Sequence, residues 1–99
     1  MVQAGMYSAA MHYLRSIEAE GTDDATRVMA KMKATPIDDF FSRGGTIRAD
    51  GLHVHDMLLM QVKTPEESTE PWDYYDFQTR IAAEDAFSPP VEGACATVE

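Results

Sequence analysis

The segment that most strongly limits how this chain folds is Leu52–Val62. It is predicted to form a long β-strand with apolar residues on both faces. Alternate side chains of a strand point to opposite faces, which places Leu58 and Met60 on one face and Met57 and Leu59 on the other. A strand of this kind belongs in a sheet that is covered on both sides. The chain has 99 residues, which is enough for one small domain with a modest core.

Two amphipathic helices are predicted before this strand, over Met6–Ala19 and Asp23–Ala34. Gly21 stands between them at a position typical of a helix C-terminal cap, and Asp23 and Asp24 favour the start of the second helix. Apolar residues recur in the first helix at spacings of three and four, which predicts a buried stripe. That stripe consists of Met6, Ala10, Tyr13, Leu14 and Ile17.

A short third helix and three strands are predicted next. Thr35–Phe41 has a helix-capping threonine, a proline at the first helical position and acidic residues in the first turn. Thr46–Ala49 is expected to pair with Leu52–Val62 through the turn-forming dipeptide Asp50-Gly51. Trp72–Ile81 provides another strand with alternating character.

The predicted fold class is therefore an α/β fragment that is locally α+β, with two helices, a short helix and about three strands. The structured part spans residues 1–87, and residues 88–99 read as an irregular C-terminal tail rich in proline, glycine and alanine. Two helices can cover one face of the narrow sheet. Missing chain or a second copy must cover the other face.

Charge excludes some partners. The 17 acidic residues outnumber the 8 lysines and arginines, which gives a net charge of −9, and this charge repels nucleic acid and anionic membranes. Arg80 is the only basic residue after position 64. No apolar run reaches the length of about 20 residues that spans a bilayer, and the first residues have no signal-peptide pattern.

The reactive side chains in the sequence do not combine into a recognisable active site. His53 and His55 share a strand face and could present two nitrogens to a metal, but that face has no third ligand, so a polar strand end is the favoured interpretation. Asp38 and Asp39 are explained as favourable charge at a helix start. Cys95, the single cysteine, has no neighbouring base. We therefore expect a non-enzymatic chain with no catalytic residue, metal or cofactor.

The methionines and the aromatic residues of the last strand have two interpretations. They can form an adaptable binding face or a stacking platform for a ligand. Core packing is the commoner use of such residues in helices and strands, and it is the interpretation adopted here. The residues concerned are Met29, Met32, Met57, Met60, Trp72, Tyr74, Tyr75 and Phe77.

An ordered series of segments resembles the C-terminal region of substrate-binding proteins of ABC transporters, in the family that includes the branched-chain amino-acid binding proteins. This family has the type I periplasmic binding fold. The resemblance covers about residues 2 to 96. It is carried by Tyr7–Leu14, Thr35–Phe41, Gly45–Gly51, His55–Met57, Lys63–Pro65 and Pro71–Tyr75.

The resemblance implies that this chain corresponds to the last quarter or so of a clamp whose two α/β lobes close on a small solute. Residues 1–87 would then form part of the C-terminal lobe and the hinge region of such a solute-binding protein. It implies capture of an amino acid or related carboxylate for uptake, a periplasmic location for the intact parent, and an ABC permease as partner. Tyr7, at the start of the first helix, is the residue placed near the solute; its alternative role is packing at the helix start. The alternative function is a homo-oligomer that covers its exposed sheet face and binds no ligand alone.

Overall fold

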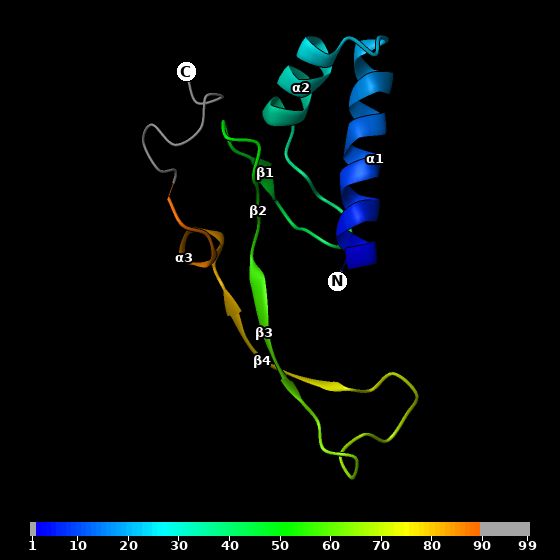
Figure 1. Cartoon of the computed structure of the whole chain (residues 1–99), viewed down its shortest axis with the longest axis vertical. Coiled ribbons are helices and arrows are strands. Elements are labelled where there is room, and N and C mark those ends of the chain that lie inside the picture. Colours follow the sequence, from blue (N-terminus) through cyan, green and yellow to red (C-terminus); the bar gives the residue numbers. More distant parts are fainter. Residues whose placement is uncertain (1, 90–99) are drawn as a thin grey trace.

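The computed structural model describes residues 2–89. Its helices are α1 (Val2–Glu20), α2 (Ala25–Ala34) and α3 (Ala83–Ala86), and its strands are β1 (Thr46–Ile47), β2 (His53–Val54), β3 (Met57–Val62) and β4 (Tyr75–Ile81). The radius of gyration is 16.9 Å, against about 13 Å for a compact domain of this length. The chain is therefore extended: α1 and α2 lie at one end, and β3 and β4 reach away from them (Figure 1).

The helix pair forms as predicted, and its local signals explain why. Gly21 has a φ of 63°, and its amide donates to the Ile17 carbonyl at 2.8 Å, which ends α1. The Asp24 side chain accepts a hydrogen bond from the Arg27 amide at 3.0 Å and caps α2. Among residues 2–89, no helix is both long and apolar enough to cross a membrane.

The buried face of α1 is the reverse of the predicted one. Ser8, His12 and Ser16 are buried, four residues apart, where α1 faces the rest of the chain. The predicted apolar stripe lies largely in solvent, and Met6 is 67% exposed. The helical period was predicted correctly, but the prediction that this stripe is buried is wrong for this chain. Among the described residues, the buried apolar side chains are Val28 and Ile37, so the core is very small.

The short helix predicted at Thr35–Phe41 does not form. Ile37 and Gly45 instead exchange backbone hydrogen bonds of 2.7 and 2.8 Å as an antiparallel bridge. Between them, Asp39 Oδ1 accepts from the amides of Phe41 and Ser42. An aspartate that bonds nearby amides in this way competes with helix formation. The prediction of a helix here is wrong, and so is the explanation of Asp38 and Asp39 as helix-start charges.

The strands form two separate two-stranded sheets, so the predicted three-stranded sheet is also wrong. The hairpin around Asp50-Gly51 is confirmed: β1 pairs antiparallel with β2, and Gly51 has a φ of 84°. The long predicted strand is interrupted at Asp56, whose carboxylate contacts Arg80 and accepts from the Ala83 amide. These contacts hold Asp56 beside the start of α3, a helix that the sequence does not predict. Among the described residues, β3 then pairs with β4 alone.

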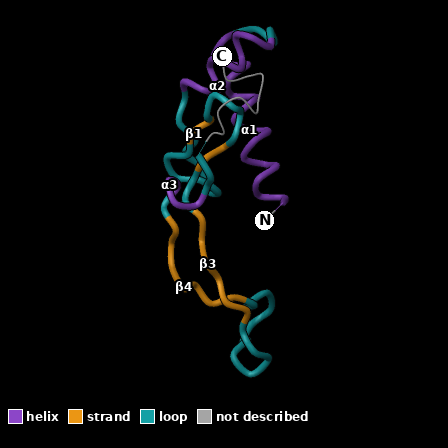
Figure 2. The backbone as a smooth tube through the Cα atoms, turned by 60° about the vertical axis from the view of Figure 1, so that its left-hand side comes forward, coloured by secondary structure: helices purple, strands orange, loops and turns teal. Residues whose placement is uncertain are grey.

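Neither α1 nor α2 covers the β3–β4 hairpin. Figures 1 and 2 show it projecting from the helical end of the chain. The cross-strand pairs Met60–Phe77 and Val62–Tyr75 lie next to each other on one face, and all four side chains are exposed, Val62 at 69% and Phe77 at 59%. We call these four residues the hairpin patch. The predictions that two helices cover the sheet and that these residues form a core are wrong for this chain by itself.

Candidate functional site

Tyr7 lies in the second turn of α1 and is 56% exposed. Its ring lies against that of Phe40, with 5.4 Å between centroids and an angle of 57° between the ring planes. Phe40 is 66% exposed. Tyr7 and Phe40 therefore form a tilted aromatic pair at the surface, within the range of favourable ring–ring contact. We call them the aromatic pair.

A hydrogen-bonded clamp holds Phe40 beside α1. Ser8 Oγ donates to Asp39 Oδ2 at 2.6 Å, although the two residues are 31 positions apart. The other carboxylate oxygen accepts from the amides of Phe41 at 2.8 Å and Ser42 at 2.9 Å. Both oxygens of Asp39 are thus used, one to reach α1 and one to fix the turn that carries Phe40.

The clamp favours the ionised form of Asp39. Partial burial raises the pKa of its carboxyl, but the hydrogen bonds from Ser8 and from the Ser42 and Phe41 amides lower it, as does attraction to His53. The net result is a pKa below the ordinary value. Hydrogen bonds to a carboxylate are stronger than those to its neutral acid, which explains the direction.

Phe41 points to the other side of the segment, into a cluster with two histidines. Its ring centroid lies 4.9 Å from that of His55 and 6.3 Å from that of His53, and the two imidazoles are 4.8 Å apart. Phe87 completes the cluster at 5.6 Å from His55. The sequence prediction that His53 and His55 lie on the same side agrees with this geometry. Within residues 2–89, no three His, Cys, Asp or Glu side chains gather as a metal site would require.

The surroundings of His53 disfavour a positive charge on its imidazole. Burial lowers its pKa below the ordinary value of 6.5, repulsion from His55 and His12 adds to this, and Asp39 opposes it. Its Nε2 and the Ser42 hydroxyl are buried without a hydrogen-bond partner among the described residues. An uncharged imidazole is therefore favoured at this position.

We expect acid to destabilise the chain through His53. The unfolded chain takes up a proton on this residue near its ordinary pKa, whereas the folded chain resists protonation until lower pH. The stabilising contribution is thus complete above about pH 6.5 and is lost as pH falls through the lowered folded-state pKa. Urea denaturation at pH 7.5, 6.5 and 5.5 should show a falling midpoint, with a shallower fall in His53→Gln. Equal slopes in the two proteins would contradict this assignment.

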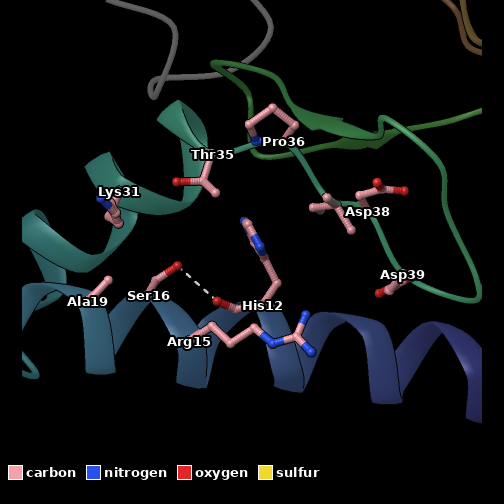
Figure 3. A pocket seen from close by; sticks show the side chains of 10 residues that line it. His12, Arg15, Ser16, Ala19, Lys31, Thr35, Pro36, Asp38 and Asp39 are labelled. Atoms are coloured by element: carbon pink, nitrogen blue, oxygen red, sulfur yellow. Dashed lines mark hydrogen bonds between the residues drawn. The ribbon is translucent and has the colours of Figure 1, made fainter.

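A pocket of about 180 Å³ lies between α1, α2 and the segment that joins α2 to β1. His12 stands in its centre, pointing from α1 toward Thr35 and Pro36, as Figure 3 shows. His12 is buried, and its Nε2 lies 3.0 Å from the Met32 carbonyl oxygen. Lys31 is drawn at one end of the pocket, and Asp39 at the other. Because basic and acidic side chains both line the pocket, the composition of its lining alone selects neither anionic nor cationic ligands.

Tyr7 stays a prediction as a solute contact. The sequence gives no sign that Ser8 bonds Asp39 or that Phe40 packs against Tyr7, because both are contacts between distant parts of the chain. Asp39 carried a usable signal: aspartate followed by Phe41 and Ser42 fits a side-chain-capped turn as well as a helix start. Cys95 lies outside the described residues, as does most of the predicted tail.

Comparison with known proteins supplies the family. The family described as periplasmic binding protein matches residues 1–69 of the chain. A periplasmic binding protein from Burkholderia mallei has a solved structure that is 46% identical, with a TM-score of 0.88 over 98% of this chain. A branched-chain amino acid ABC transporter periplasmic ligand-binding protein from Burkholderia xenovorans is 43% identical, with the same TM-score and coverage. No curated protein matches the chain.

The chain spans only 26% of the length of each of these two structures. This share explains the small core and the exposed apolar faces of α1 and of the β3–β4 hairpin, because a quarter of a larger fold cannot cover its own surfaces. At 43–46% identity over nearly the whole chain, the similarity is far closer than a shared fold alone. Together with the match of residues 1–69, it shows that this chain belongs to the periplasmic binding protein family.

Proposed function

We propose that the chain is the C-terminal part of an ABC transporter solute-binding protein, which captures a small amino acid or related carboxylate in the periplasm and presents it to a membrane permease. The role is non-enzymatic, since the solute is held by reversible contacts and lobe closure. The observation that carries this proposal is the 43% identity over 98% of the chain to the Burkholderia xenovorans ligand-binding protein.

Tyr7 is the proposed solute contact. Its ring is exposed beside Phe40, and no hydrogen bond among the described residues engages its hydroxyl. An amphipathic ring of this kind offers both an apolar surface and a hydrogen-bonding group to a bound solute. The lobes absent from this chain would supply the remaining contacts.

Titration calorimetry tests the proposal in two forms of the protein. One is the chain alone; the other is a hybrid in which the chain replaces the matching quarter of the Burkholderia mallei protein. L-Leucine, L-valine and L-glutamate are the probes. We expect the hybrid to bind at least one of them, and Tyr7→Ala to weaken binding more than Tyr74→Ala, a matched exposed tyrosine on the hairpin. Absence of binding in both forms would refute the proposal.

A second function is favoured by the exposed apolar surfaces. The hairpin patch and the α1 stripe offer area that a second copy can bury, and such burial commonly couples folding to association. A self-associating fragment of this kind would bind no solute alone. Sedimentation of the chain over a dilution series tests it: a folded monomer at all concentrations would exclude this function.

A further inference from the structure

We infer that the pocket between α1 and α2 binds a small oxyanion, either a carboxylate or a phosphate, through Arg15 and Lys31. The site is separate from the proposed solute contact, since Tyr7 is not one of the residues that line this pocket. It therefore adds a second binding function to the one proposed above.

The size of the pocket suits an ion with few attached atoms. Its volume of about 180 Å³ is well below the roughly 300–1,000 Å³ of pockets that hold drug-sized ligands. A sphere of that volume is roughly 7 Å across, which is less than the Debye length of about 8 Å in physiological salt. Each charge on the lining therefore acts on a ligand anywhere inside the pocket.

The two acidic residues of the lining are already engaged. Both oxygens of Asp39 accept hydrogen bonds, one from the Ser8 hydroxyl and the other from two backbone amides. Asp38 Oδ1 lies 3.7 Å from a guanidinium nitrogen of Arg43, and the Asp38 side chain is 66% exposed. Hydrogen bonds, an ion pair and water thus compensate the negative charges, so the pocket attracts a cationic ligand only weakly.

The two basic residues of the lining are less engaged. Lys31 Nζ lies 4.0 Å from Glu20 Oε1, at the edge of ion-pair distance, while Glu20 Oε2 accepts from Arg27 at 3.1 Å. Arg15, drawn beside His12 in Figure 3, forms no ion pair with any residue in the described part of the chain. Two cations are therefore available to an anion, and the Arg15 guanidinium can offer two parallel N–H groups to a carboxylate or phosphate.

Neutral groups complete the site. The Thr35 hydroxyl has no hydrogen-bond partner among the described residues, so it is free to donate to an anion. His12 Nε2 lies 3.0 Å from the Met32 carbonyl oxygen; because a carbonyl only accepts, this nitrogen carries the hydrogen, and the bond fixes the ring as a wall of the pocket. Pro36 and Ile37 supply carbon surface for the atoms attached to the anionic group.

The pocket lies on the side of α1 that faces away from the missing layers of the fold. Arg15 follows Met6 by about two and a half helical turns, so the two side chains lie on opposite sides of the helix. Met6 belongs to the exposed apolar stripe, which is the surface that the rest of a longer protein is expected to cover. An apolar layer over the pocket would instead leave charged side chains buried without partners. We therefore expect the pocket to stay open to solvent in the hybrid protein.

Titration calorimetry of the hybrid protein with malonate and with inorganic phosphate, in HEPES buffer of low ionic strength, tests the site. We expect at least one anion to bind with a dissociation constant of about 1 mM or below, as charge-assisted contacts to a very small ligand allow. Arg15→Gln should weaken this binding about tenfold, because a hydrogen-bonded charge is lost. Lys31→Gln should weaken it about threefold, because Glu20 already engages this ammonium group in part. The tighter of the two anions identifies the ligand as a phosphate or a carboxylate.

Lys33→Gln is the matched control, since it removes the same charge from α2 but does not line the pocket. It should leave the anion affinity unchanged within about twofold. NMR of the hybrid with ¹³C-labelled histidine locates the anion: the His12 ring signals, assigned by their loss in His12→Gln, should shift on titration. The signals of His53 and His55, which do not line the pocket, should not shift.

A competition experiment separates this site from the solute contact. Anion binding should persist when L-leucine is present in excess. Absence of binding by either anion, an equal loss in Lys33→Gln and Arg15→Gln, or displacement by leucine would overturn the inference. A hybrid that binds an anion through Arg15 but binds no amino acid would refute the proposed function and leave this site standing.

Discussion

Replacing Gly45 by alanine is expected to lower the free energy of unfolding by about 3 kcal/mol, the upper end of overpacking penalties. A Cβ at this position would overlap Ser42 Oγ and His53 Nε2. Both atoms are buried ends of side chains next to the Ile37–Gly45 bridge, so relieving the overlap requires Ser42 to change rotamer and the His53 ring, which lies 4.8 Å from that of His55, to shift. A methyl group cannot hydrogen-bond to either polar atom, so the substitution brings no compensating hydrogen bond.

Two other glycines serve as controls in the same urea denaturation experiment. Gly44 has a φ of 67°, and a Cβ added there would meet no other atom within 4 Å, so Gly44→Ala should cost about 1–2 kcal/mol through backbone strain alone. Gly5 lies inside α1, where a Cβ would make only an ordinary contact with Phe41, so Gly5→Ala should be neutral or stabilising by up to about 1 kcal/mol. If Gly45→Ala is no more destabilising than Gly44→Ala, the packing around Gly45 is not as described.

Placing lysines at Val62 and Phe77 is expected to weaken self-association of the chain about 100-fold. Burying an aliphatic or aromatic side chain contributes roughly 1.5–3 kcal/mol, and two such losses correspond to at least that factor. Lysine is chosen because the chain has a net charge of −9: added positive charge reduces general repulsion, so weaker association must come from loss of the hairpin patch. Sedimentation velocity at several concentrations gives the measurement.

The matched control is Gln61→Lys with Gln78→Lys, which adds the same charge at exposed positions of the same two strands, outside the hairpin patch. This control should associate like the wild type. In the hybrid protein, the added lobes are expected to cover the patch, so the hybrid should sediment as a monomer. A wild-type chain that is folded and monomeric at high concentration would contradict the prediction.

Local signals in the sequence were sufficient for three parts of the fold. The helix pair follows from hydrophobic periodicity together with Gly21 and the Asp24 cap. The β1–β2 hairpin follows from Asp50-Gly51, since the turn needs the positive φ that Gly51 adopts. The pairing strand at the end of the chain follows from its alternation, although it begins at Tyr75 rather than Trp72.

The wrong predictions of a helix at Thr35–Phe41 and of an uninterrupted long strand share one physical cause, which is contact between residues far apart in the sequence. A helix start and a side-chain-capped turn use the same residue types, so Thr35–Phe41 could be resolved only by the bridge between Ile37 and Gly45. The interruption at Asp56 depends on its contacts with Arg80 and Ala83, which are more than 20 residues away. Such contacts leave no periodic trace in the sequence.

The amino-acid sequence was enough to locate the main helices and turns and to indicate the family that the chain resembles, because caps, glycines and periodicity act over a few residues. Which face of α1 is buried, and which residues surround Tyr7, depend instead on contacts between distant segments. Ser8 replaces the apolar stripe at the buried face because Asp39, 31 positions away, accepts its hydrogen bond. The apolar surfaces stay exposed because a chain that spans 26% of its solved relatives lacks the remaining layers of the fold.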